Sequence, residues 1–405
     1  MTVYDAVIVG GRIAGASTAL LLARAGARVA VVERSRLGSD TLSTHALMRA
    51  GVVQLSRWGL LERLISADTP SIASALFHYG DGTTTRVSIR PAAGVDALYA
   101  PRRYLLDRLL ADAAAEAGAE ILPEMTVTGL RRDDSGRVCG VYLVGRAGRA
   151  LELPAVTTVG ADGIRSTVAD LVQAPVVRHG RTASAVLYRY VAGLPTDGYE
   201  WAYGDGAAAG LIPTNNGETC VFVSAASDRW RAIRRAGGEH AFAALLARAA
   251  PGLRDRIASA GQAGRLRGWA GTPGYVRRPW GPGWALVGDA GYYKDPITTH
   301  GMTDAMRDAE LLADAILASN TSGRPPVAAL ARYQATRDRL SSDLFAATET
   351  VAGYGWTTDG VLTLLRRVSS AMSDEVDYLE SLPNRRWGRR ASGDPHQVTA
   401  VGGPG

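Results

Sequence analysis

The stretch DAVIVGGRIAGASTALLLARAGARVAVVERS, residues 5–35, reads as a buried strand, an alanine-rich helix and a second buried strand. This order is typical of the βαβ unit that binds dinucleotides. The glycine fingerprint G-x-G-x-x-G of that unit falls on Gly10, position 12 and Gly15, but position 12 is occupied by Arg12. The sequence therefore raises two questions: whether the unit holds a dinucleotide, and which one.

The unit keeps the other features that a dinucleotide needs. Gly10 permits the tight turn after the strand, and Gly15 lets the helix pack closely, with its N-terminus facing a pyrophosphate. Glu33 ends the second strand, where a carboxylate accepts from a ribose hydroxyl and repels a 2′-phosphate, so FAD or NAD is favoured. The residues predicted to bind the nucleotide here are Gly10, Gly11, Arg12, Ala14, Gly15, Glu33 and Arg34.

Arg12 has two interpretations. In the first, Gly11 supplies the missing flexibility and the Arg12 guanidinium lies along the pyrophosphate as a charge partner. In the second, the unit has lost its nucleotide. The choice between them depends on motifs further along the chain.

The segment GDAGYYKDPITTHGM, residues 288–302, favours a flavin. It places Asp289 at the end of a predicted strand and Gly301 at the N-terminus of a long predicted helix. Asp289 can bind a ribityl hydroxyl. The backbone amides near Gly301 and the positive end of the helix can hold the negative charge that a reduced isoalloxazine develops.

Three elements in this order resemble the class A flavoprotein monooxygenases, the para-hydroxybenzoate hydroxylase-like FAD superfamily. They are the βαβ unit, VGADGIRSTVAD at residues 159–170, and the segment at 288–302. The superfamily also contains flavin-dependent halogenases and geranylgeranyl reductases. The resemblance covers about residues 1–345 and implies one FAD at the N-terminal unit.

The resemblance implies further cofactor contacts. Arg103 in RRYLLD matches the family pattern R-x-x-L and would support the FAD diphosphate, with Arg102 as the alternative. Arg49 in STHALMRAGV falls near the pyrophosphate or the mobile flavin ring, whereas His45 is expected to be structural or near the FAD entrance. The other residues expected at FAD, or at a transient NADH or NADPH, are Val127, Asp162, Gly163, Arg165, Gly288, Asp289, Pro296, Gly301 and Met302.

The activity that the resemblance implies is FAD-dependent monooxygenation. NAD(P)H would reduce the flavin, O₂ would add to it, and a flavin hydroperoxide would transfer one oxygen atom to a small aromatic or polyketide-like substrate. The alternatives are an FAD-dependent reductase or dehydrogenase of the geranylgeranyl reductase type, and a non-catalytic flavin-binding protein. Halogenation is not expected, because the signature W-x-W-x-I-P is absent and the nearest stretch, WAYGDGAAAGLIP, has a different spacing.

Two residues near the expected flavin are candidate catalytic groups. His300 stands where the hydroxylase pattern has a small or amide residue, and it is either a proton donor or acceptor or a loop histidine bonded to backbone. Lys294, the only lysine of the chain, either orients substrate or is a solvated loop cation. The candidate walls of an aromatic-substrate pocket, with core packing as the alternative, are Tyr188, Tyr190, Trp201, Tyr203 and Phe222.

The expected fold class is α/β, with an FAD-binding Rossmann-like βαβ domain, an inserted mixed-sheet substrate domain and C-terminal helices. The FAD-binding domain is predicted at 1–70, 98–175 and 267–325, and the substrate-binding sheet at 71–97 and 176–266. For the rest of the chain, the sequence predicts C-terminal helices at 326–384 and a disordered Gly/Pro/Arg-rich tail at 385–405.

Composition excludes several other classes. The net charge is +6, but the basic residues are spread along the chain rather than clustered as in nucleic-acid binders. Cys139 and Cys220 are far apart and indicate neither a disulfide framework nor a metal site. Without a signal peptide or a run long enough to span a bilayer, a cytoplasmic protein is expected, with its oligomeric state open.

Overall fold

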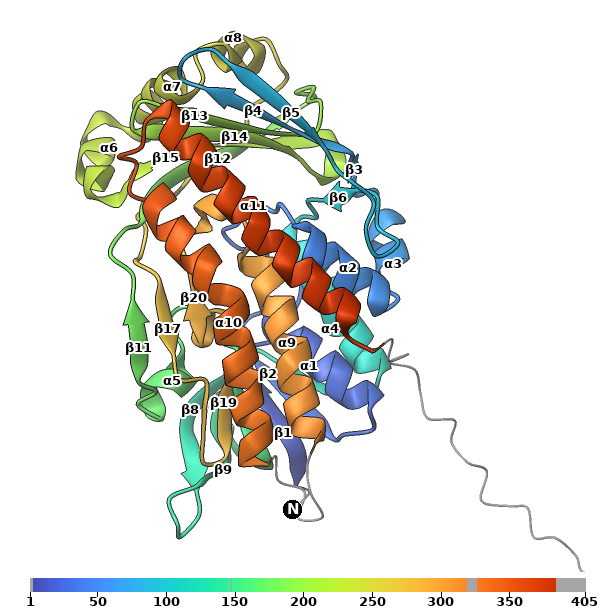
Figure 1. The fold of residues 1–405 in the computed structure, drawn as a ribbon. Helices are drawn as coiled ribbons and strands as arrows, with labels where there is room; N and C mark the ends of the chain where they lie inside the picture. The colour runs from blue at the N-terminus through green and yellow to red at the C-terminus, as the bar shows by residue number, and fades with distance from the viewer. Residues whose placement is uncertain (1–2, 147, 319–325, 384–405) are drawn as a thin grey trace, which may run out of the picture.

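The computed structural model describes residues 3–146, 148–318 and 326–383. Figure 1 shows one sheet in the lower half of the molecule, around β1 (Tyr4–Val9), and a second sheet at the top. The long helices α10 (Val327–Val351) and α11 (Thr358–Ser381) run along the front, and α11 reaches the upper sheet.

The lower sheet is built around β1, whose residues Ala6, Val7 and Ile8 are fully buried. β1 pairs in parallel with β2 on one side and with β10 on the other. In spatial order the strands are β18 (Trp280–Gly281), β19 (Trp284–Leu286), β10 (Ala150–Gly160), β1, β2 (Val29–Glu33) and β7 (Glu120–Pro123). An antiparallel extension from β10 contains β9 (Val138–Gly145) and β8 (Met125–Arg132). Because β19, β10, β1, β2 and β7 are parallel, the loops after them meet at one edge, where α/β sheets bind ligands.

The helices beside this sheet are largely buried. α1 (Ile13–Arg24) packs against α4 (Arg103–Glu116) and α9 (Gly301–Leu317), so most of its surface contacts protein, as its alanine- and leucine-rich sequence requires. α9 in turn contacts α10 and α2 (Arg49–Arg57). Two short helices complete this part, α3 (Leu61–Ile65) and α5 (Thr167–Leu171).

The upper sheet has seven strands. In spatial order they are β16 (Arg267–Trp269), β12 (Ser184–Ala192), β15 (Glu218–Ala226), β14 (Ala207–Pro213), β13 (Tyr199–Gly204), β4 (Ser74–Tyr79) and β5 (Thr84–Ser88). One face packs on α6 (Trp230–Ala236), α7 (Gly238–Ala249) and α8 (Leu253–Ala258). The other face joins the large core shared with α1 and α9, and α11 contacts it at β13.

Two small sheets complete the fold. One consists of β11 (Val176–His179), β17 (Tyr275–Arg277) and β20 (Tyr292–Tyr293), and the other of β3 (Ser71–Ile72) and β6 (Leu98–Tyr99). The predicted α/β fold class, with a βαβ unit, a mixed sheet and C-terminal helices, is confirmed. Within the described residues, no helix is both long and apolar enough to cross a membrane.

The predicted division into domains stays a prediction. The upper sheet takes in β16, just beyond the predicted limit at 266, whereas β11 pairs outside this sheet. The predicted tail at 385–405 and the end of the segment at 267–325 lie outside the described residues.

Candidate FAD and substrate site

The turn after β1 leaves no room for side chains at its first and third glycines. Gly10 has φ +105°, and a Cβ there would lie 2.4 Å from the carbonyl oxygen of Ala161. A Cβ on Gly15 would lie 1.8 Å from the carbonyl oxygen of Gly10. This is the close strand–helix approach that a dinucleotide-binding turn requires.

Glu33 lies at the adjacent strand end with its carboxylate buried. Its oxygens accept hydrogen bonds from the backbone N–H of Gly11 and of Ser35, both at 2.8 Å. These bonds hold the carboxylate next to the turn after β1, where a ribose hydroxyl can approach it. This carboxylate acceptor beside the glycine turn therefore fits the ribose of the adenosine half of FAD.

Arg12 occupies the N-cap position of α1 and is half-buried. It lines a small cleft with Gly11, Glu33 and Asp107, and in the described part of the chain its guanidinium has no hydrogen-bond or ion-pair partner. A guanidinium at a helix N-terminus without a carboxylate bound to it is available to an anion. The geometry supports the first interpretation of Arg12, in which it pairs with the pyrophosphate.

Replacing Arg12 tests that interpretation. Arg12→Ala is expected to weaken FAD binding by roughly 1–3 kcal/mol, the range for a charge-assisted hydrogen bond. Arg12→Gly, which restores the fingerprint, is expected to do less harm because it adds backbone freedom beside the phosphates. FAD titration of the apoprotein measures both effects. Equal, negligible effects would show that the Arg12 side chain points into solvent.

Asp289 lies in the 3₁₀ turn Gly288–Ala290, directly after β19. Its backbone carbonyl accepts from the Tyr275 hydroxyl at 2.6 Å, but its carboxylate has no partner in the described residues. Burial raises the pKa of Asp289 to about 6, against the opposing charges of Lys294 and Arg103. A hydroxyl donor from a ribityl chain would satisfy this carboxylate, so this end of the site also fits FAD.

Asp289→Ala is expected to weaken FAD binding by about 10- to 150-fold, the equivalent of about 1.5–3 kcal/mol for a hydrogen bond to a charged group. In the parent protein, affinity is expected to fall as the pH drops below about 6, because protonation removes the charged acceptor. Asp289→Asn is the matched control and should lose this pH dependence. FAD titrations at pH 5 and pH 8 measure it, and unchanged affinity in Asp289→Ala would remove Asp289 from the ribityl site.

The two candidate arginines for the diphosphate have different surroundings. Arg102 donates to Glu218 at 2.6 Å and stacks with its guanidinium carbon 3.6 Å from the centre of the Tyr190 ring. Arg103 holds Asp107 at 3.1 Å, and its charge also acts on Asp289. Arg103 thus binds Asp107, which lines the same cleft as Gly11 and Glu33, and this supports Arg103 over Arg102.

Asp162 is held by local contacts. Its carboxylate accepts from the Ser166 hydroxyl at 2.5 Å and from the Val168 backbone N–H at 3.2 Å, which ties the start of α5 to the end of β10. Arg165 is exposed, and Val127 is a core residue of β8 itself. The roles expected for Asp162, Arg165 and Val127 at the cofactor stay predictions.

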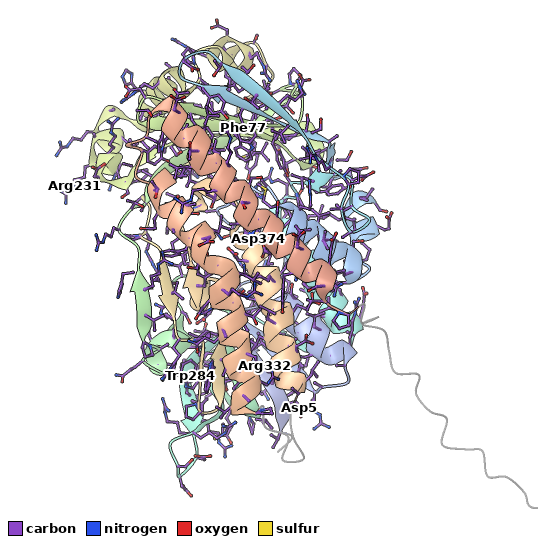
Figure 2. The ribbon with its side chains drawn as sticks, in the orientation of Figure 1. Asp5, Phe77, Arg231, Trp284, Arg332 and Asp374 are labelled. Atoms are coloured by element: carbon purple, nitrogen blue, oxygen red, sulfur yellow. The ribbon has the colours of Figure 1, made fainter. Side chains whose placement is uncertain are left out.

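A cavity of about 440 Å³ lies between the upper sheet, α11 and the loop before α9. This volume is within the range typical of small-molecule sites. Its walls are mostly apolar and include Phe77, Tyr199, Trp201 and Tyr203. Figure 2 labels Phe77 beside the N-terminal half of α11. At its other end the cavity meets Arg49, the loop residues Ile297, Thr298 and Thr299, and His300.

The five predicted aromatic residues share one face of the upper sheet, but the cavity uses only part of it. Trp201 and Tyr203 line the cavity, whereas Tyr188, Tyr190 and Phe222 do not. Tyr188 and Tyr190 lie on β12, towards the opposite edge of the sheet. There the Tyr190 hydroxyl hydrogen-bonds to the buried ring of His45.

His300 is the N-cap residue of α9 and is 1% exposed. Its Nε2 hydrogen-bonds to the carboxylate of Glu375 on α11, and its Nδ1 has no partner in the described residues. Burial lowers the pKa of His300, although the Glu375 carboxylate opposes the shift. The prediction of a loop histidine bonded to backbone is wrong, because the only ring partner described is a side chain from the C-terminal helix.

Lys294 is buried and forms an ion pair with Asp304. The prediction of a solvated loop cation is therefore wrong: the loop folds under α9 and removes the ammonium from water. Burial lowers the pKa of Lys294 to about 7, and the charge of Arg307 adds to the shift. Lys294 does not line the cavity, so a direct contact with substrate has no geometric support.

Arg307 connects these groups into one buried network. It donates to Asp304 at 2.9 Å, to Asp308 at 2.7 Å and to Glu375 at 3.1 Å. One ligand atom each of His300, Asp304 and Glu375 lies within 4.8 Å of the others, close enough to surround a metal ion. Protein cations already bind both carboxylates, so the arrangement is better described as an ion-pair network than as a metal centre.

Comparison with known families identifies the chain. A family model described as FAD binding domain matches residues 3–348. The chain belongs to this family. It is an FAD-dependent oxidoreductase of the superfamily that its motifs resemble, and FAD is its cofactor. α11 lies beyond the matched residues, yet it supplies one wall of the cavity.

Two curated relatives have different reactions in their names. The digeranylgeranylglycerophospholipid reductase of Methanocella arvoryzae is 27% identical over 357 residues, 84% of each chain. Squalene epoxidase 3 of Arabidopsis thaliana is 27% identical over 77% of this chain and 60% of its own. One name describes a reduction and the other an epoxidation, so the curated relatives do not agree on one reaction.

Solved structures share the architecture. PqsL of P. aeruginosa, in complex with 2-aminobenzoylacetate, matches with a TM-score of 0.75 and 25% identity, over 92% of this chain and 100% of the other. The flavin-dependent halogenase CmlS matches with a TM-score of 0.76 and 22% identity, over 96% and 72%. The second likeness shows the fold alone.

Glu375 is the functional candidate that sequence reasoning missed. It lies 75 residues from His300, and no motif joins them. A signal was nevertheless present, because Glu375 interrupts the apolar stripe of α11 at helical spacing. That stripe consists of Val361, Leu364, Val368, Ala371 and Leu379.

Proposed function

We propose that this FAD-dependent oxidoreductase is a monooxygenase that inserts one oxygen atom from O₂ into a small aromatic or polyketide-like substrate, with NAD(P)H as electron donor. The observation that carries the proposal is the aromatic-walled cavity, which ends at Arg49 and at the loop before α9. The family resemblance implies that the flavin ring lies at that loop. A substrate in the cavity would therefore lie against the reactive end of the cofactor.

When bound, FAD supplies the redox chemistry, accepting electrons and activating O₂. The chain's own residues would hold it through Glu33 and Arg12 at the adenosine and phosphate end, and through Asp289 at the ribityl chain. The N-terminus of α9 offers a positive field to a developing anion.

The cavity walls exclude water and orient the substrate. Trp201 and Tyr203 offer flat apolar surfaces, and Leu362, Met372 and Val376 of α11 close the other side. Such walls favour a planar ring over a flexible polar molecule. In PqsL, the aromatic compound 2-aminobenzoylacetate is bound by a protein of the same fold, which supports an aromatic substrate for this chain.

The second candidate function is an FAD-dependent reduction or dehydrogenation of a carbon–carbon bond. It is favoured by the similarity to digeranylgeranylglycerophospholipid reductase, which extends over most of both chains. The two functions differ in whether oxygen is consumed as product forms.

Anaerobic reduction of the bound flavin by NADH and by NADPH, with and without a panel of small aromatics, tests the proposal. We expect faster reduction with an aromatic ligand, followed on aeration by one O₂ consumed per oxygenated product. Product without O₂ consumption would favour the reductase. Failure of either nicotinamide to bleach the flavin under every ligand would favour a non-catalytic flavin-binding protein.

A further inference from the structure

We propose that Arg366 of α11 binds an acidic group at the end of the cavity remote from the loop before α9, and so selects an elongated substrate with one negative charge. Arg366 is then a specificity-determining residue rather than a catalytic one, and it lies on a helix outside the family-matched segment. The inference deepens the proposed function, on which it rests for the aromatic or polyketide-like body of the substrate.

Arg366 belongs to the face of α11 that lines the cavity. The members of this face are Leu362, Leu365, Arg366, Val368, Ser369, Met372, Ser373 and Val376. Arg366 lies one helical turn from Leu362 and one turn from Ser369, so it continues a largely apolar face. Its neighbour Arg367 is rotated by about 100° around the helix and does not line the cavity. Of two adjacent arginines, only Arg366 therefore borders the cavity.

Arg366 and the loop before α9 are at opposite ends of the cavity. Glu375 marks the second end, because it hydrogen-bonds to His300 at the N-cap of α9. The rise of α11 from position 366 to position 375 is about 14 Å. At the first end, burial raises the pKa of Tyr79 on β4, and the nearby charge of Arg366 opposes the shift. A ligand that contacts both ends must therefore be elongated.

The charge on the cavity wall has one sign. The residues described as lining the cavity include two arginines and no acidic side chain. One of them, Arg49, is expected at the pyrophosphate or the flavin ring, which leaves Arg366 for the substrate. Within the described ranges, Arg366 has no hydrogen-bond or ion-pair partner. Asp81 also acts on Tyr79, but its carboxylate accepts from the hydroxyl and the backbone N–H of Thr83 instead.

The acidic group that fits this end is a carboxylate. A guanidinium binds a carboxylate through two parallel N–H···O bonds. One arginine also balances the single charge of a carboxylate, whereas a phosphate monoester carries about −1.5 to −2 and would leave excess charge beside apolar walls. Because Arg366 is exposed at the open side of the cavity, water screens the pair, and we expect a moderate effect on affinity.

The test uses the oxidised FAD-bound protein and two probes of one shape, biphenyl-4-carboxylate and biphenyl-4-carboxamide. Binding is followed by the change in flavin absorbance, without NAD(P)H. We expect the carboxylate to bind at least about fivefold more tightly, as for a partly exposed ion pair of good geometry. We expect this preference to decrease at about 1 M salt, where charges are screened beyond about 3 Å.

Two variants and one control assign the preference. Arg366→Gln removes the charge and keeps a polar side chain, so the preference should fall below about twofold. Arg366→Glu places a like charge at this end, so the carboxamide should bind more tightly than the carboxylate. Arg367→Gln is the matched control, because it removes the same charge from the adjacent position outside the cavity. It should keep the preference of the parent, and unchanged FAD content and melting temperature show that each variant is folded.

Benzoate and benzamide test the distance between the two ends. A single ring is too short to span about 14 Å, so a benzoate that perturbs the flavin cannot reach Arg366. Arg366→Gln should therefore leave the flavin-detected preference within this short pair unchanged, to within about twofold. An equal loss of preference in the short and the long pair would overturn the elongated substrate.

Equal affinity for the two biphenyl probes in the parent, no binding of either probe, or an unchanged preference in Arg366→Gln would each overturn the proposal. Weaker binding of NAD(P)H by Arg366→Gln, with the carboxylate preference intact, would assign this arginine to the nucleotide instead. Because the probe titrations involve no turnover, they are independent of oxygen insertion. A failed oxygenation assay with intact probe discrimination would count against the proposed function alone.

Discussion

Gly15→Ala is expected to lower the free energy of unfolding by at least about 3 kcal/mol, the upper part of the range for an overpacked core. The added Cβ would lie 1.8 Å from the carbonyl oxygen of Gly10, and the next contact is the carbon of the same carbonyl. No side-chain rotation relieves such a clash, so β1 and α1 must move apart. FAD is expected to be absent from the purified protein. Chemical denaturation and the flavin content measure the two effects.

Gly252→Ala is the matched control for this substitution. Gly252 is at the N-cap of α8 with φ −70°, and a Cβ there would meet nothing within 4 Å. Its stability should stay within about 0.5 kcal/mol of the parent, as for surface substitutions. If Gly15→Ala were equally harmless and retained FAD, the close approach of strand and helix would not be what shapes the nucleotide site.

The broken fingerprint now has a physical explanation. Gly10 and Gly15 are at positions where a side chain would collide with backbone, so these glycines are required by the fold itself. Position 12 has no such constraint, because its residue points towards a cleft beside Glu33 and Asp107. A large cation can therefore replace glycine there without disturbing the turn, provided that the cleft holds an anion.

The sequence predicted the βαβ unit because each part of that unit is local: buried runs of five or six residues, a helix of alanine and leucine, and glycines at fixed spacing. The fold class and the superfamily followed from three such local motifs. The C-terminal helices were also predictable from periodicity.

The composition of the cavity was not predictable in the same way. Its walls come from strands β4, β5 and β13, from the loop before α9 and from α11, which are far apart in the sequence. Alternation along a strand indicates which residues share a face, and all five predicted aromatic residues do. It does not indicate the lateral order of strands, which places β12 and β15 away from the cavity and β13 beside it.

The pairing of buried charged side chains was also not predictable from the sequence. The sequence left two interpretations of Lys294, because it does not show which acidic side chain pairs with a lysine in a loop. Here that acid is Asp304, one helical turn inside α9, and Arg307 and Glu375 complete the network from two helices. Such networks depend on helix packing, which pairs residues that no local pattern connects.

The same network explains why the next variant should fold. In His300→Ala, Glu375 keeps its bond to Arg307 at 3.1 Å, and Arg307 keeps Asp304 and Asp308. The buried carboxylate therefore retains a charged partner. The side chains expected to hold FAD, those of Arg12, Glu33 and Asp289, have no hydrogen bond to His300 in the described residues and so lose none.

His300→Ala is expected to retain FAD and its reduction by NAD(P)H but to lose at least about tenfold in product formed per NAD(P)H, with more hydrogen peroxide released. The reason is loss of the imidazole at the N-cap of α9, next to the expected position of the flavin, since general acid–base help is typically worth about 10²–10⁴-fold. Product and peroxide are quantified against NAD(P)H consumed, with His78→Ala as the control because its ring is outside the cavity. Coupling equal to that of the parent would leave His300 with a structural role, as the residue that joins α9 to α11.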